Sequence, residues 1–218
     1  MEKFIHKFGI FKNGFTLAEV LITLVIIGVI AALTIPTVVN NTQKQEFVSK
    51  LKKTYSSFAQ VTNKIIAEEG SPKYAGWLSG NESLYRMYKK YFALAKDCDT
   101  AAGCFASEYE KLNSGPLWYP DTGRRRFVLA DGVSVMFADA DPQCPDISSG
   151  KVLNLCGTIV VDVNGMKNPN QYGRDLFFFA LKEDGLYPYG CDSAFCNESD
   201  SEGSGCACKV LRENAMNY

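Results

Sequence analysis

The apolar segment from Phe15 to Ile35 constrains this chain more than any other feature of its sequence. About 20 consecutive apolar residues form a helix long enough to cross a lipid bilayer. The segment contains one charged residue, Glu19, close to its beginning. Because a carboxylate in hydrocarbon is costly unless another group neutralises it, we expect Glu19 to have a partner.

A short basic leader precedes the apolar segment and carries Lys3, Lys7 and Lys12 against Glu2. Positively charged flanks stay in the cytoplasm, so we expect everything after the segment on the outer side of the membrane. A cleaved secretory signal has an apolar core of about 7–15 residues and then a small-x-small site, and neither feature fits this sequence. An uncleaved signal anchor fits the charge, length and orientation equally well.

The residues at the end of the leader resemble the processing motif of type IV prepilins and of the pilin-like subunits of type II secretion systems. The stretch that carries the resemblance is Gly14-Phe15-Thr16-Leu17-Ala18-Glu19, and Pro36 lies where that family commonly has a proline. The resemblance covers roughly the first quarter of the chain. It implies cleavage after Gly14 by a membrane prepilin peptidase and N-methylation of Phe15.

Cleavage at that position creates a cationic amine at Phe15, near the carboxylate of Glu19. In a bundle of such helices, Glu19 of one subunit can pair with the Phe15 amine of its neighbour. An unpaired charge in hydrocarbon costs at least ~2.5 kcal/mol on insertion scales, so this pairing favours assembly. The alternative is that Glu19 reaches the nearby membrane interface. Phe15, Glu19 and Pro36 are therefore the expected assembly residues.

A helical pattern continues beyond Pro36. Apolar residues recur every three or four positions, at Phe47, Leu51, Tyr55, Phe58, Val61 and Ile65. Gly70 and Pro72 are typical of a helix end. We expect one helix from about Thr16 to Glu68, with a kink or local melting at Pro36, which lacks a backbone donor. The expected organisation is a leader at 1–14, a transmembrane and assembly helix at 15–36, its amphipathic second half at 37–70 and an extracytoplasmic head at 71–218.

The head is expected to be α+β. Short helices are predicted near residues 81–94 and 105–112. Four β-rich runs follow at 127–130, 133–138, 158–163 and 176–181, and Asp131-Gly132 suits a hairpin turn between the first two. They predict a four-stranded, mostly antiparallel sheet packed on the second half of the long helix, since each needs the other to bury its apolar face. This arrangement also resembles the pilin architecture, in which a disulfide commonly clamps the C-terminal part.

All eight cysteines follow residue 97, in the expected outer domain, which indicates an oxidising compartment. A zinc tetrathiolate is the alternative for the last four. The favoured disulfides are two local loops, Cys98–Cys104 and Cys144–Cys156, with Cys191 and Cys196 paired to Cys206 and Cys208 in an order left open.

Residues 162–175 are rich in oxygen ligands and turn formers. Asp162, Asn164 and Asp175 are candidate ligands for Ca²⁺, a hard ion that takes six to eight oxygens. The segment resembles the Asp/Asn-rich loops of secretion pseudopilins, some of which bind calcium, but it lacks the EF-hand spacing. The alternative is turn chemistry, because Asn-Gly and Pro-Asn pairs favour bends. We expect no other cofactor.

Enzymatic chemistry has little support in the sequence. The single histidine, His6, lies in the leader, so the rest of the chain offers no histidine-activated nucleophile. The run Arg124-Arg125-Arg126 is the one basic cluster outside the long helix, and it could touch phosphates. However, the net charge is −1, and −3 once the three lysines and one glutamate of the leader are removed. This balance argues against general nucleic-acid affinity, and we expect no specific nucleic-acid partner.

These observations predict a non-enzymatic structural subunit, a pilin or pseudopilin, of a type IV pilus or a type II secretion-like filament. The expected partners are the prepilin peptidase, other pilin subunits, the inner-membrane assembly machinery and membrane lipid. The expected location is a single pass of the inner membrane with the head outside, followed by assembly into a filament. The alternative is a signal-anchored, disulfide-rich binding domain that does not polymerise.

Overall fold

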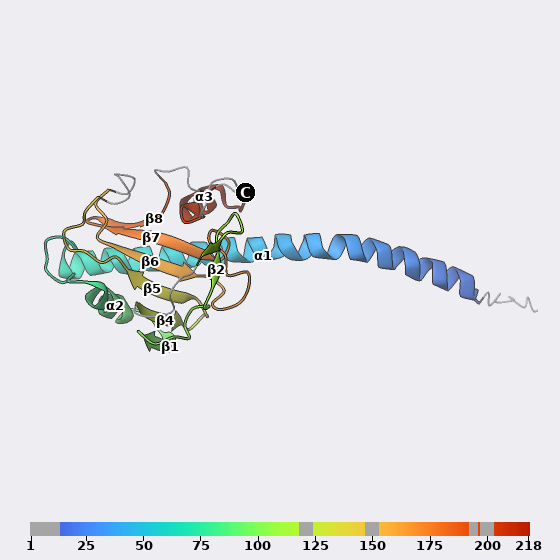
Figure 1. Ribbon diagram of the computed structural model, residues 1–218, viewed down its shortest axis with the longest axis horizontal. Helices are drawn as coiled ribbons and strands as arrows, with labels where there is room; N and C mark the ends of the chain where they lie inside the picture. Colours follow the sequence, from blue (N-terminus) through green and yellow to red (C-terminus); the bar gives the residue numbers. More distant parts are fainter. Residues whose placement is uncertain (1–13, 118–123, 147–152, 192–195, 197–202) are drawn as a thin grey trace, which may run out of the picture. The chain divides into compact units, whose positions relative to one another are not determined.

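A computed structural model describes residues 14–117, 124–146, 153–191, 196 and 203–218 (Figure 1). The chain divides into two compact units, residues 1–42 and 43–218, and the second holds the α+β head. The predicted fold class is confirmed: a long N-terminal helix is followed by an antiparallel sheet.

Helix α1 runs without a break from Leu17 to Glu69 and includes Pro36. The expected local melting at Pro36 is therefore wrong, because a proline removes only one backbone donor and the flanking turns keep theirs. The predicted end of the helix is confirmed. Gly70 adopts a left-handed φ of 88° and donates its N–H to the carbonyl of Ile66, which closes the last turn.

The second half of α1 buries one stripe of side chains against the sheet of the head (Figure 1). Most of the predicted apolar stripe lies there, while Tyr55 and Val61 are only partly buried. Two threonines, Thr54 and Thr62, also belong to the stripe, although the pattern of apolar residues alone does not reveal them. The buried residues of α1 are Phe47, Val48, Leu51, Thr54, Phe58, Thr62 and Ile65.

The main sheet has six strands rather than the four predicted, all paired antiparallel in the order β1-β4-β5-β6-β7-β8. The four predicted runs form the centre of the sheet, and the two additional strands are its edges. An edge strand pairs with a neighbour on one side only, and water or a loop borders its other side. Its apolar pattern is therefore weak, which is why these two strands were not predicted. The strands are β1 (Leu94–Asp99), β4 (Arg125–Leu129), β5 (Ser134–Ala138), β6 (Gly157–Asp162), β7 (Leu176–Lys182) and β8 (Gly185–Pro188).

Both faces of the central strands are covered, which is why they read as continuous apolar runs. One face packs against α1, while Met136, Val160 and Phe178 on the other face pack against Phe105 and Tyr109. The helix expected at 105–112 is wrong. Tyr109–Glu110 form a short strand, β2, paired with β3 at Pro116–Leu117, and Phe105 and Tyr109 pack on the face of the sheet away from α1.

Two short helices complete the head. Helix α2 (Asn81–Lys89) buries Leu84, Tyr85, Met87 and Tyr88, so the helix predicted near 81–94 is confirmed but ends earlier. Helix α3 (Cys206–Glu213) lies near the C-terminus and was not predicted. Its eight residues are too few for a helical period to be recognised in the sequence.

Candidate functional site

The first turn of α1 is closed by a reciprocal pair of contacts between Thr16 and Glu19. The backbone N–H and the hydroxyl of Thr16 both donate to Oε2 of Glu19, at 2.8 and 2.7 Å. In return, the backbone N–H of Glu19 donates to the Thr16 hydroxyl at 3.2 Å. This is a capping box, in which a threonine at the helix start and a glutamate three residues later satisfy each other's orphan donors.

The capping box was not predicted, although Thr-x-x-Glu before an apolar run is its known sequence signature. Phe15 precedes it directly, and its side chain is 87% exposed. The Gly14–Phe15 bond thus lies outside the helix, next to the carboxylate of Glu19. Pro36 lies on the same helix about 25 Å further along, at 1.5 Å per residue, so it does not belong to this cluster.

Among the residues that the structure describes, none covers the apolar half of α1. Its most apolar 18-residue window has a mean hydropathy of 2.6, and none of that window is buried. In the part of the chain that the structure describes, α1 is the one helix long and apolar enough to cross a membrane. Leu24, Ile27 and Leu33 are exposed together with many other large apolar side chains of this half. A continuous apolar surface of this size is unfavourable in water, so lipid or other helices must cover it.

The eight cysteines form four disulfides, and none is free. The sequence left open how the last four cysteines pair. The structure joins Cys191 to Cys208 and Cys196 to Cys206, so these sulfur atoms are in disulfides and not in a zinc tetrathiolate. Both bonds attach the segment after β8 to helix α3. The remaining two join Cys98 to Cys104 and Cys144 to Cys156.

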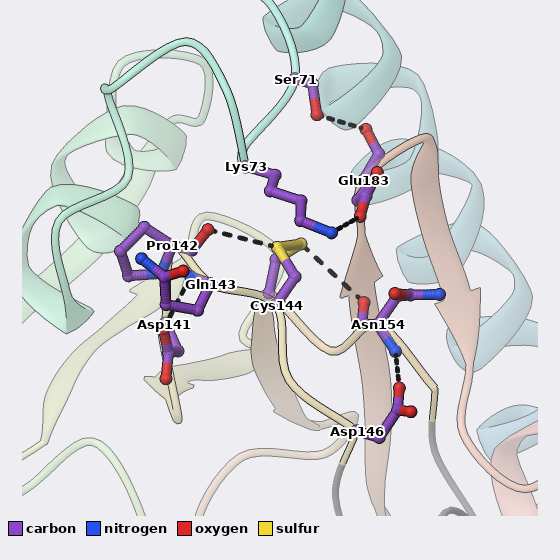
Figure 2. Close-up of a disulfide and its surroundings, with 10 residues drawn as sticks. Ser71, Lys73, Asp141, Pro142, Gln143, Cys144, Asp146, Asn154 and Glu183 are labelled. Carbon is purple, nitrogen blue, oxygen red and sulfur yellow. Dashed lines mark hydrogen bonds and ion pairs between the residues drawn. A yellow bond between two sulfur atoms is a disulfide. The ribbon is translucent and has the colours of Figure 1, made fainter.

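Figure 2 shows the Cys144–Cys156 bond beside the pair formed by Lys73 and Glu183. A surface cleft of about 480 Å³ lies near these residues. Its charged groups already have partners: Glu183 binds Lys73, and Asp184 accepts from Tyr187 at 3.0 Å. The residues lining the cleft are Leu153, Asn154, Lys182, Glu183, Asp184 and Tyr187.

A second polar cluster lies in the segment between β6 and β7. Asp162 and Asp175 are both fully buried. Asp162 accepts hydrogen bonds from the hydroxyl of Tyr109 at 2.7 Å and from the backbone N–H of Asn164 at 3.1 Å. Asp175 accepts from the backbone N–H groups of Asn170 and Gln171, at 2.8 and 2.7 Å.

Burial opposes the ionised form of both carboxyls. It raises the pKa of Asp162 well above the ordinary value, and the nearby charge of Asp175 raises it further. Burial also raises the pKa of Asp175 to about 6, although the backbone N–H groups of Gln171 and Asn170 oppose this. A hydrogen bond from the Asn164 side chain also lowers the pKa of Asp175. The structure thus brings together the three residues predicted as calcium ligands.

Two amide oxygens, Oδ1 of Asn164 and Oδ1 of Asn170, are buried in this segment without a hydrogen-bond partner among the described residues. Sequence reasoning named Asn164 but missed Asn170 and Tyr109. No described group of three or more His, Cys, Asp or Glu side chains could hold a metal ion. A cation here depends on the two carboxylates together with amide and carbonyl oxygens, a donor set that fits Ca²⁺.

Arg125 and Arg126 are the first two residues of β4 and make their contacts within the head. Arg125 forms ion pairs with Asp99 and with Glu82. The side chain of Arg126 is fully buried, and it donates to the carbonyl of Thr100 at 3.0 Å. The guanidinium groups of these two residues therefore fasten β4 to β1 and α2.

Residues 11–35 match the family model of the prokaryotic N-terminal methylation motif, which is the signature of type IV pilins and pseudopilins. The matched residues include the Gly14–Phe15 bond, the capping box and the apolar segment up to Ile35. No curated protein and no solved structure is significantly similar to the chain. The motif describes a structural subunit rather than a class of enzyme.

Proposed function

We propose that this chain, which carries the type IV pilin and pseudopilin signature, is a precursor cut after Gly14 and N-methylated at Phe15 that polymerises into a filament. The observation that carries the proposal is the methylation motif at 11–35 on a helix whose apolar half is left exposed by the described part of the chain. The filament belongs to a type IV pilus or to a type II secretion-like system.

The physical basis of assembly is the exchange of one apolar environment for another. Before assembly, lipid covers the exposed side chains of the apolar half of α1. In the filament, neighbouring helices cover them. The new amine at Phe15 and the carboxylate of Glu19 then neutralise each other between subunits, because an unpaired charge in this environment costs at least ~2.5 kcal/mol.

The head remains outside the membrane, where its four disulfides are stable. In this function the protein acts mechanically. The helices form the core of the fibre and the heads form its surface. Cleavage of the Gly14–Phe15 bond is carried out by the peptidase and not by this chain.

The test is the substitution Glu19→Val in the full chain. We expect cleavage after Gly14 to continue, while the fraction of subunits in filaments falls roughly tenfold or more, since an uncompensated amine remains. Glu46→Gln is the matched control, because Glu46 is an exposed acid of α1 outside the apolar segment and forms an ion pair with Lys50. Normal polymerisation of the Glu19→Val chain would contradict the pairing through Glu19, whereas a parent chain and a control that both form no filaments would favour the anchored binding domain.

A second function, calcium binding, is favoured by the buried cluster between β6 and β7. We propose that Asp162 and Asp175 hold Ca²⁺ with the amide oxygens of Asn164 and Asn170. The cation would offset the repulsion between two buried carboxylates and would bind the two amide oxygens that lack donors. Its role is to stabilise the head rather than to take part in a reaction.

The calcium proposal is tested by thermal unfolding of the full chain in detergent. EDTA should lower the melting temperature and added Ca²⁺ should restore it. Asp162→Asn should remove this response, whereas Asp139→Asn, which changes an exposed acid, should keep it. An unchanged melting temperature in both directions would rule out the site.

A further inference from the structure

The carboxylate that assembly requires is already held within its own subunit. Both donors of Thr16 bind the same oxygen of Glu19, Oε2, and the Glu19 N–H returns a bond to the Thr16 hydroxyl. Glu19 is therefore fixed at the first turn of α1, beside the Gly14–Phe15 bond.

We propose that Thr16 is a positioning residue that presents Glu19, through its Oε1 atom, to the Phe15 amine of a neighbouring subunit. This inference rests on the proposed function and deepens it, because it names the residue that prepares the carboxylate for pairing.

The free side chain of a glutamate has several rotamers, and one set of them reaches away from the neighbour toward the membrane interface. A carboxylate fixed by Thr16 has lost this freedom before the neighbour arrives. The entropic cost of pairing is then smaller, as in any preorganised binding group.

Thr16 has a second effect in the unassembled subunit. Hydrogen bonds to an ionised group are stronger than those between neutral groups, and a carboxylate in an apolar environment needs them most. The capping box thus lowers the free-energy cost of holding the Glu19 carboxylate in the membrane. Its bonds go to Oε2, which leaves Oε1 for the amine of the neighbouring subunit. It also explains why a threonine, with a hydroxyl and a backbone N–H on one residue, suits this position.

The decisive variant is Thr16→Val, which removes the hydroxyl but retains the branched shape of the side chain. The critical concentration for filament growth is measured on the processed chain after detergent removal, with the N-terminus verified by mass spectrometry. We expect it to rise roughly tenfold in Thr16→Val, the effect of ordering one long side chain. Thr16→Ser, which keeps the hydroxyl, should remain within about twofold of the parent chain.

Thr23→Val is the matched control, because the Thr23 hydroxyl binds the carbonyl of Val20 in the same helix and does not touch Glu19. It should leave the critical concentration unchanged. In a Glu19→Val background, Thr16→Val should have no further effect on assembly, since its partner is gone.

A second readout does not depend on processing. In the full chain in detergent micelles, hydrogen exchange at the Glu19 amide should become roughly tenfold faster in Thr16→Val and should stay slow in Thr16→Ser. Equal exchange in the two variants, or assembly of Thr16→Val at or below the parent's critical concentration, would overturn the inference. Normal assembly of Glu19→Val would instead refute the pairing through Glu19, and a parent chain that forms no filaments would refute the proposed function, so these failures are distinguishable.

Discussion

At the scale of single residues, this chain supplies specific donors to the carboxylates of its apolar segment and of its buried core. Glu19 receives two hydrogen bonds from Thr16, and Asp175 receives two from backbone N–H groups. Donors of this kind offset only part of the cost of a buried charge. The remaining cost should be measurable as a dependence of stability on pH.

The first prediction concerns Asp175, whose pKa burial raises to about 6 in the folded head. The unfolded chain keeps the ordinary pKa of 3.8, so the folded state binds a proton at a higher pH than the unfolded state does. Without calcium, the free energy of unfolding should therefore rise by about 1 kcal/mol as the pH falls from 7 to 5. Urea unfolding of the full chain in detergent with EDTA measures this.

Asp175→Asn should abolish much of this rise, because the amide does not titrate. The head contains no histidine, so Asp162, whose pKa burial also raises, is the main other group of the head that could change charge in this interval. A head that loses stability between pH 7 and pH 5 in EDTA would contradict the raised pKa of this carboxyl.

The second prediction concerns Gly190, where the chain after β8 passes the start of α3. A Cβ atom at Gly190 would lie 2.0 Å from the carbonyl oxygen of Gly205, and the residue has a left-handed φ of 90°. Gly132 has nearly the same φ, 88°, but open space around it. Gly190→Ala should therefore cost at least ~2 kcal/mol more in the free energy of unfolding than Gly132→Ala, which carries the backbone strain alone.

Urea unfolding with intact disulfides compares these two variants. If they cost the same, the contact between Gly190 and Gly205 does not restrict the head.

At the scale of elements, a buried hydroxyl pair joins α1 to α2. Thr62 donates to the carbonyl of Phe58 at 2.7 Å and lies 2.6 Å from the hydroxyl of Tyr88. A threonine hydroxyl has one proton, so Tyr88 must be the donor in the second contact. Burial raises the pKa of Tyr88, consistent with a phenol that stays protonated.

This assignment predicts an asymmetry between two variants. Thr62→Val leaves the Tyr88 O–H buried without an acceptor and should cost about 2 kcal/mol in the free energy of unfolding. Tyr88→Phe removes that donor and leaves Thr62 bound to Phe58, so it should cost about 1 kcal/mol. Chemical denaturation of the two variants checks the order, and the reverse order would contradict it.

Elements with strong periodicity could be predicted from the sequence. The second half of helix α1 repeats an apolar residue every three or four positions, and the central strands β4 to β7 each contain an unbroken apolar run because both their faces are covered. Strand β1 reads Leu-Ala-Lys-Asp-Cys-Asp and has irregular register with β4, so neither alternation nor apolar content marks it. Residues 105–112 have apolar spacing that suits a helix, but Phe105 and Tyr109 pack on the sheet and only Tyr109–Glu110 form regular structure, the strand β2.

The residues of the candidate sites also fall into two groups, those that local sequence reveals and those that only the fold brings together. Gly14, Phe15 and Glu19 follow from local sequence, because the motif is contiguous. Tyr109 lies 53 positions before Asp162 and contacts it only after β2 has packed on the sheet, so no local pattern could connect them. The order of the last two disulfides likewise depends on where α3 lies.

At the scale of the whole molecule, the two units differ in how their apolar side chains are covered. The apolar half of α1 requires lipid or other subunits, whereas the head buries its own core and closes it with disulfides. Folding of the head and assembly of the helices should therefore be separable by mutation.

The head's dependence on its disulfides gives a further prediction. Replacing Cys196 and Cys206 together by serine should lower the free energy of unfolding by roughly 2–4 kcal/mol, because this bond and Cys191–Cys208 tie α3 to the head. Hydrogen exchange of α3 amides should increase first, since a helix of eight residues is not stable alone. Protection of α3 equal to that of the parent chain would contradict this role.

The most direct test of the central claim is the mass of the N-terminal peptide of the chain isolated from membranes and from any filaments it forms. A polymerising, processed subunit must begin at Phe15 and carry one added methyl group on its amine. We expect this peptide in both fractions. Chains that retain residues 1–14, or that begin beyond Ile35, and yet function normally would contradict the account.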